Sequence, residues 1–268
     1  MSRLALSIVM LLGFVAQTMA GKPISVTTCG QVVPPGTTAT LAKTIVCPPW
    51  GVCYPPCVQG DPACSQPLQP VVTCRSAAEC PDPANDTCAF PPGVTSSVGI
   101  YMGKGAWLQM NSHSVSGAFI GILSGNSSGT GAGKMKITGP GAIFGNQQGV
   151  VFPTNVRVEG VKLHDNAMLG ISATARVRLE NVVGKNNGLL AGAARRITAK
   201  GVTATGNGTG LGSAGSLTVA DSSITGSTSA DIESVRRPRL RNVVCDKSAQ
   251  LLLPQNTLGP PWGVCSND

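Results

Sequence analysis

Charged and aromatic residues are scarce in this chain of 268 residues. Lys, Arg, Asp and Glu make up 12% of it, Phe, Trp and Tyr only 4%, and there are two histidines. No basic run is interleaved with aromatic residues, so the formal net charge of +8 does not indicate nucleic acid as a partner. Much of the surface must consist of Ser, Thr, Asn and Gly, a composition that suits a secreted β-protein better than a cytosolic enzyme.

Long hydrophobic runs are also absent, except at the amino terminus. Residues 1–20 contain the basic Arg3, then an apolar run over 4–15, then small residues ending at Ala20. This is the layout of a cleaved secretory signal peptide, and the run is shorter than the roughly 20 residues that span a bilayer. We therefore expect a secreted or extracytoplasmic protein without a membrane span, with the periplasm and the cell surface both open.

The ten cysteines indicate disulfides and not a metal site. Eight of them lie between Cys29 and Cys88. Because the chain has only two histidines, a zinc site would need thiolates alone. Residues 21–96 also hold fourteen of the twenty prolines, which excludes long helices and central strands. We expect a Cys/Pro-rich N-terminal cap region at 21–96 with about four disulfides, whose pairing the sequence leaves open.

From about residue 97 the chain repeats with a period of 20 or 21 residues. Apolar residues mark one position of each repeat: Ile137, Val158, Leu179, Ala199, Val219 and Leu240. A turn position steps in register with them: Gly139, Gly160, Asn181, Gly201, Asp221 and Asn242. Between these positions apolar and polar residues alternate, which is the period of a β-strand. So regular a period indicates a solenoid built of short strands.

Asparagines recur at one further turn position. They are 20 or 21 residues apart, with Ser227 next in line: Asn166, Asn187 and Asn207. Asparagine tolerates left-handed backbone conformations, and its amide hydrogen-bonds from coil to coil. With this ladder, residues 97–245 resemble the right-handed parallel β-helix (pectin-lyase-like) proteins. The resemblance implies an all-β fold, a right-handed parallel β-helix solenoid of about six to seven coils with disulfide-stabilised N- and C-terminal caps.

The six residues PPWGVC occur twice, near the two ends of the chain. A solenoid has two open ends with unpaired backbone and apolar side chains, so it needs caps. We interpret Trp50 and Trp262, one in each copy, as plugs for the two ends of the core. Residues 246–268 form the C-terminal cap. We expect Cys245 and Cys265 to pair, since no other cysteine lies in this part of the chain.

Two pairs of residues are candidates for acid–base chemistry, and each also has a structural explanation. Glu159 and Glu180 occupy the same position of adjacent repeats, which places their carboxylates about 5 Å apart, as in retaining glycosidases. Arginines two residues earlier in each repeat explain them equally well as members of a salt-bridged surface ladder. His164 and Asp165 form a general-base pair only if a turn brings them together, because neighbours on a strand point to opposite faces.

The segment RRPRLR resembles the Arg-x-Pro-x-x-Arg element of pectate lyases, with Arg236, Pro238 and Arg241 at the matching positions. The resemblance implies that Arg236 takes the proton α to a uronate carboxylate, assisted by bound calcium. A supporting aspartate cluster is missing, because the nearby acids fall on different faces: Asp221, Asp231, Glu233 and Asp246. The sequence therefore predicts no metal or cofactor, with calcium only if the lyase resemblance holds.

A basic ladder on one outward face supports a non-catalytic interpretation. The residues of this predicted ligand-binding ladder are Lys136, Arg157, Arg178 and Arg239. They would bind uronates or sulfates electrostatically, although residues 131–245 contain only Phe144 and Phe152 as aromatic platforms. We expect a non-catalytic protein of the cell surface or matrix that binds anionic polysaccharide or cell-surface glycan. The alternative is a polysaccharide lyase or glycoside hydrolase of the pectin-lyase-like superfamily. Enzymatic activity and oligomeric state both stay open.

Overall fold

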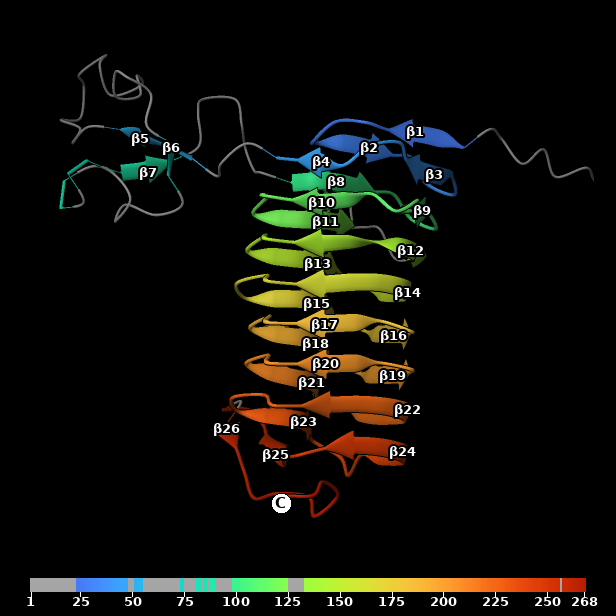
Figure 1. Cartoon of the computed structure of the whole chain (residues 1–268), viewed down its shortest axis with the longest axis vertical. Helices are drawn as coiled ribbons and strands as arrows, with labels where there is room; N and C mark the ends of the chain where they lie inside the picture. The colour runs from blue at the N-terminus through green and yellow to red at the C-terminus, as the bar shows by residue number, and fades with distance from the viewer. Residues whose placement is uncertain are drawn as a thin grey trace, which may run out of the picture.

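The structure is a computed structural model, and its described residues form β-strands without any helix. They are residues 23–47, 51–54, 73–74, 81–82, 84–85, 87–89, 98–124, 133–255 and 257–268. The predicted signal peptide at 1–20 and Trp50 lie outside them. The strands build a parallel β-solenoid of about seven turns, which confirms the predicted fold class. Figure 1 shows the turns stacked one above the other. No described segment is a helix that could cross a bilayer.

Each turn of the solenoid contributes to three faces, of which the first carries the candidate site. Its strands pair in parallel, turn on turn. They are β1 (Ile24–Val26), β3 (Thr38–Leu41), β9 (Trp107–Gln109), β12 (Lys134–Phe144), β14 (Asn155–His164), β16 (Arg176–Glu180), β19 (Arg196–Lys200), β22 (Ser216–Thr225) and β24 (Arg239–Cys245).

The second face follows after a turn, and four long strands bend around this corner to serve both faces. They are β12, β14, β22 and β24. The other strands of the second face are β4 (Ile45–Val46), β10 (Ser114–Ser116), β17 (Val183–Lys185) and β20 (Thr203–Thr205).

The third face is a ten-stranded sheet that is parallel except at its last strand. Its strands are β2 (Gln31–Val33), β8 (Val98–Met102), β11 (Ile120–Ser124), β13 (Gln148–Phe152), β15 (Leu169–Ala173), β18 (Leu189–Ala193), β21 (Thr209–Ser213), β23 (Ala230–Ser234), β25 (Ser248–Leu252) and the antiparallel β26 (Thr257–Leu258). A separate antiparallel sheet contains β5 (Gly51–Tyr54), β6 (Thr73–Cys74) and β7 (Thr87–Ala89).

The N-terminal residues differ from the expected division, in which residues 21–96 form a cap and the solenoid begins at 97. Strands β1 and β3 pair in parallel with each other and then with β9, and β2 pairs with β8. The solenoid therefore begins at Ile24, and the Cys/Pro-rich residues are inserted into one of its turns, between β4 and β8. A disulfide joins Cys29 to Cys47 just before the insertion. The pairings of the other N-terminal cysteines fall outside the described residues.

The core is a set of columns of apolar side chains, one residue from each turn. The six marker residues of the repeat pair in register from Ile137 to Leu240. The first five are at most 1% exposed, whereas Leu240 of the last turn is only partly buried. The corner that follows needs a left-handed backbone, which Gly, Asn and Asp adopt most easily: φ is +65° at Gly201 and +52° at Asn181. The first copy differs, because a cis peptide precedes Pro140 there.

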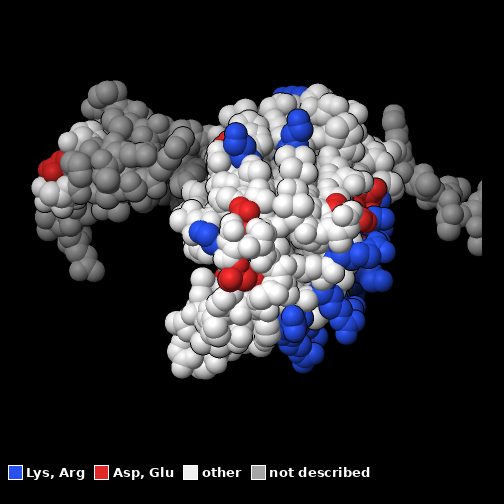
Figure 2. Space-filling model, turned by 60° about the horizontal axis from the view of Figure 1, so that its bottom comes forward, with Lys and Arg blue, Asp and Glu red and all other residues white. Residues whose placement is uncertain are grey.

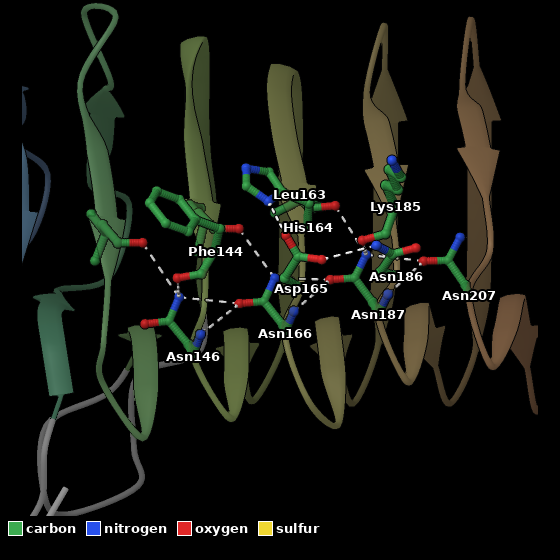
Figure 3. A network of polar contacts seen from close by, with 12 residues as sticks. Phe144, Asn146, Leu163, His164, Asp165, Asn166, Lys185, Asn186, Asn187 and Asn207 are labelled. Carbon is green, nitrogen blue, oxygen red and sulfur yellow. Dashed lines mark hydrogen bonds and ion pairs between the residues drawn. The ribbon is translucent and has the colours of Figure 1, made fainter. Parts of the chain in front are cut away.

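The asparagine ladder lies at the next corner and is fully enclosed. Asn146, one turn before the expected start, continues it, so four stacked asparagines are at most 2% exposed. The Nδ2 of each of the first three donates to the Oδ1 of the next asparagine along the solenoid, at 2.9 Å from Asn166 to Asn187 and 3.0 Å from Asn187 to Asn207 (Figure 3). The ladder ends because Ser227 is too short, and Asp231 accepts the backbone N–H of Ser227 instead.

The C-terminal end is closed by a segment folded back on the last turns. Cys245 and Cys265 form the disulfide that the sequence predicts. Half-buried Trp262 donates its indole N–H to the carbonyl oxygen of Ser234, so it lies over the last turn of the core. Asp268 accepts hydrogen bonds from Ser248 and from the backbone N–H groups of Val264 and Cys265. Burial opposes its ionisation, but these donors outweigh it and lower the pKa of Asp268.

Replacing Asp268 with asparagine should therefore destabilise the protein in a pH-dependent way. The lowered pKa in the folded state means that the carboxylate stabilises the fold above its unfolded pKa and ceases to do so as the pH falls. We expect the melting temperature of Asp268→Asn to lie about 3 °C below wild type at neutral pH, with the gap closing below about pH 4. Thermal melts over a pH series check this, and a gap that persists in acid would contradict the assignment.

Candidate functional site

The outward side chains of the first face form three rows along the solenoid axis. Residues of one row are register partners in successive turns. The first row is Lys134, Asn155, Arg176, Arg196 and Ser216; the second is Trp107, Lys136, Arg157, Arg178, Thr198, Thr218 and Arg239; the third is Gln109, Thr138, Glu159, Glu180, Lys200, Ala220 and Arg241. Figure 2 shows Lys and Arg side chains gathered along one side of the solenoid.

A hollow of about 480 Å³ opens on this face and is called the tryptophan hollow below. Its polar lining is almost entirely basic: Lys134, Lys136, Asn155, Arg157, Arg176 and Arg178, with Trp107 at one end. The ammonium of Lys136 lies 4.8 Å from the centre of the Trp107 ring, and the indole N–H donates to Thr138 at 2.9 Å. The hollow thus combines cations with an aromatic ring that a hydrogen bond and a cation–π contact hold in place.

Three of the four predicted ladder cations are already paired with carboxylates. Arg157 contacts both Glu159, at 3.4 Å, and Glu180, at 2.7 Å. Lys136 lies 3.2 Å from Glu159, and Arg178 lies 2.5 Å from Glu180. Burial opposes the ionisation of Glu180, but the two arginines outweigh it and lower its pKa. The structure therefore places the two glutamates side by side and binds both of them in one salt-bridge network.

The cations of the first row, unlike most of those in the second, have no carboxylate partner in the described part of the chain. Lys134, Arg176 and Arg196 are exposed, and within the described residues none of them forms an ion pair. Arg196 donates from Nε only to the hydroxyl of Ser216, at 3.2 Å. These side chains keep their charge available to a ligand, in contrast to the ion-paired cations of the second row.

His164 and Asp165 do come together. Asp165 adopts a left-handed backbone, with φ of +55°, and this turn brings its carboxylate to 2.7 Å from Nδ1 of His164 (Figure 3). The imidazole stacks on Phe144 with ring centres 4.8 Å apart, and Asn186 donates to Asp165 at 3.0 Å. These hydrogen bonds, the one with His164 first, lower the pKa of Asp165. Asp165 and Phe144 thus fix the orientation of the His164 ring. The pair lies on the second face, away from the tryptophan hollow.

The predicted lyase element does not bring Arg236 and Arg241 to one site. Arg236 lines a second hollow, of about 350 Å³. Arg241 belongs to the third row, and its guanidinium lies 3.5 Å from the carboxylate of Asp221. Among the described residues, no group of three or more His, Cys, Asp or Glu could hold a metal ion.

Sequence reasoning missed Trp107 and the first row. Trp107 precedes its register partner Lys136 by 29 residues instead of the usual 20 or 21, because the stretch GNSSGTGA at 125–132 lengthens that turn. A period of 20 or 21 residues therefore does not align Trp107 with the basic ladder. The first row was visible in principle, since Arg176 and Arg196 are separated by one period.

Comparisons with protein-family models, with curated proteins and with solved structures find no match to this chain. Its class is therefore defined by the fold and the site alone. The chain is a disulfide-closed parallel β-solenoid with an enclosed asparagine ladder and a cationic first face.

Proposed function

We propose that this is an exported, non-catalytic protein of the cell surface or matrix that binds anionic polysaccharide along its first face. The observation that carries the proposal is the continuity of the cations. Every turn from β12 to β24 except β22 places at least one Lys or Arg on that face, and two hollows lie between them. A face of this kind suits an extended polymer better than a compact small molecule.

The spacing of the turns favours a ligand that lies along the solenoid axis. Neighbouring parallel strands are about 4.8 Å apart, so one row offers a contact at each step of that length. An extended sugar chain that carries an acidic group on each residue can meet a cation repeatedly, and Trp107 offers its ring at the N-terminal end of the path.

Two further features support the setting of this proposal. The disulfides at both ends of the solenoid indicate an oxidising environment outside the cytoplasm. The asparagine ladder and the repeat favour membership of the pectin-lyase-like group of right-handed β-helices, in which case the first face lies on a scaffold common among polysaccharide-binding proteins.

Binding to three dextrans tests the proposal. We expect the full chain, produced in an oxidising compartment, to bind carboxymethyl-dextran and dextran sulfate but not neutral dextran, with affinity falling as salt rises. Trp107→Ala should weaken binding about fivefold through loss of the ring, whereas Trp107→Phe should keep most of it. Titration calorimetry measures both. Equal binding of neutral dextran, or no binding of either charged polymer at low ionic strength, would overturn the proposal.

The same samples decide the alternative function, a polysaccharide lyase or glycoside hydrolase. The observation that favours it is the oriented His164–Asp165 pair, which could act as a general base. New unsaturated or reducing ends in uronic polysaccharides, with or without calcium, that disappear in His164→Ala would establish an enzyme. Loss of those ends in Arg236→Ala instead would point to the lyase element.

A further inference from the structure

The second hollow, called the arginine hollow below, differs in chemistry from the tryptophan hollow. The hollow has a volume of about 350 Å³. Four arginines from the last turns of the solenoid line it, together with Ser216, Leu217 and Thr218. Arg196 belongs to β19, Arg236 and Arg237 precede β24, and Arg239 begins it. There is no carboxylate and no aromatic ring in this lining.

The arginine hollow has no counter-charge of its own. Within the described residues, the side chains of Arg236, Arg237 and Arg239 take part in no ion pair. Asp221 of β22 is paired with Arg241, which lies outside the lining. The tryptophan hollow is different, because Glu159 and Glu180 neutralise part of its positive charge. Four like charges around one hollow repel each other, and an anion of high charge density would relieve this repulsion.

The residue type adds specificity to this charge. All four cations are arginines, whose planar guanidinium groups donate two parallel hydrogen bonds to an oxyanion and are less strongly hydrated than an ammonium group. A tetrahedral ester presents three oxygens in different directions, so several guanidinium groups can bind it at once. A carboxylate presents two oxygens in one plane and satisfies fewer of them.

We propose that the arginine hollow recognises sulfate ester groups, so that the polymer bound by the first face is a sulfated polysaccharide. This rests on the proposed function, which it narrows from anionic to sulfated polymers. Arg196 connects the two sites, because its register partner Arg176 lines the tryptophan hollow one turn earlier. A chain lying along the axis therefore passes from the aromatic end of the face to the arginine hollow without leaving the cationic stripe.

Two dextrans of equal degree of substitution test this, one carboxymethylated and one sulfated. We expect wild type to bind dextran sulfate about tenfold more tightly than carboxymethyl-dextran at the same ionic strength. The triple variant Arg236→Lys/Arg237→Lys/Arg239→Lys keeps the charge but loses the guanidinium groups. It should lose about tenfold in affinity for dextran sulfate and less than about twofold for carboxymethyl-dextran. The single variant Arg237→Lys repeats the test with the smallest change to the fold.

The outcomes separate the two proposals. Absence of binding to both charged dextrans defeats the proposed function itself. Equal affinity for both, or an equal loss for both in the lysine variant, defeats only the sulfate assignment. Inorganic sulfate is the third arm, added as a competitor of bound dextran sulfate. If free sulfate ions displace the polymer as effectively as an equal concentration of polymer-borne sulfate groups does, the hollow is a site for a free anion, and this inference is wrong.

Discussion

Replacing Asn187 with alanine should lower the free energy of unfolding by about 3 kcal/mol, because it interrupts the enclosed ladder in the middle of the solenoid. The Oδ1 atom of Asn187 accepts from Asn166 at 2.9 Å, and its Nδ2 donates to the carbonyl of Leu163, also at 2.9 Å, and to Asn207 at 3.0 Å. The side chain is only 2% exposed, so water cannot replace these partners. Alanine leaves buried donors and acceptors with fewer partners on both adjacent turns.

The neighbouring Asn186 provides the matched control. Asn186 has a left-handed backbone, with φ of +53°, and its exposed amide donates to the exposed Asp165. Asn186→Gly should therefore cost less than about 1 kcal/mol, since glycine keeps the backbone conformation. Urea unfolding compares the two variants directly, through the midpoint of the transition and the slope of the unfolding free energy against urea concentration. Equal losses would show that the enclosed amide of Asn187 contributes no more than the exposed amide beside it, and that the ladder contributes little.

The repeat could be predicted from the sequence because register is periodic. Once Ile137, Val158 and Leu179 fall at one spacing, parallel pairing places every later residue of a turn, including the stacked Glu159 and Glu180. The first turns could not be found in this way. The insertion between β4 and β8 separates register partners such as Val32 and Tyr101 by far more than one period, so no local pattern connects them. Their pairing is visible only in three dimensions.

The sequence predicts which face carries the basic residues, but not which of them are paired with carboxylates. Alternation along β14 and β16 put Arg157 and Arg178 on the outer face, where they are. Which cations are neutralised depends on side-chain directions across turns, and the sequence does not give these. Arg157 reaches the glutamate of the next turn, Glu180, as well as the one on its own strand. Likewise, the pairing of His164 with its neighbour depends on one left-handed residue, Asp165.

This distinction between paired and unpaired cations leads to the prediction with the largest functional effect. The double variant Arg176→Gln/Arg196→Gln removes two unpaired charges from the first row and should weaken binding of charged dextrans about 30-fold, as expected for two charge-assisted hydrogen bonds on an exposed face. The slope of affinity against salt should fall as well, because fewer ionic contacts remain. Titration calorimetry over a salt series measures both quantities.

The control removes an equal number of charged groups without changing the net charge. In Arg178→Gln/Glu180→Gln both ion pairs of Glu180 disappear, the one with Arg178 and the one with Arg157. Arg157 keeps its contact with Glu159, and the first row is untouched. If the ligand is bound by unpaired cations, this variant should change affinity less than about threefold and leave the salt slope as in wild type. A loss as large as that of the first-row variant would mean that the paired arginines exchange their glutamates for the ligand on binding. The polymer would then lie over the second row, and Glu159 and Glu180 would compete with its acidic groups for the arginines.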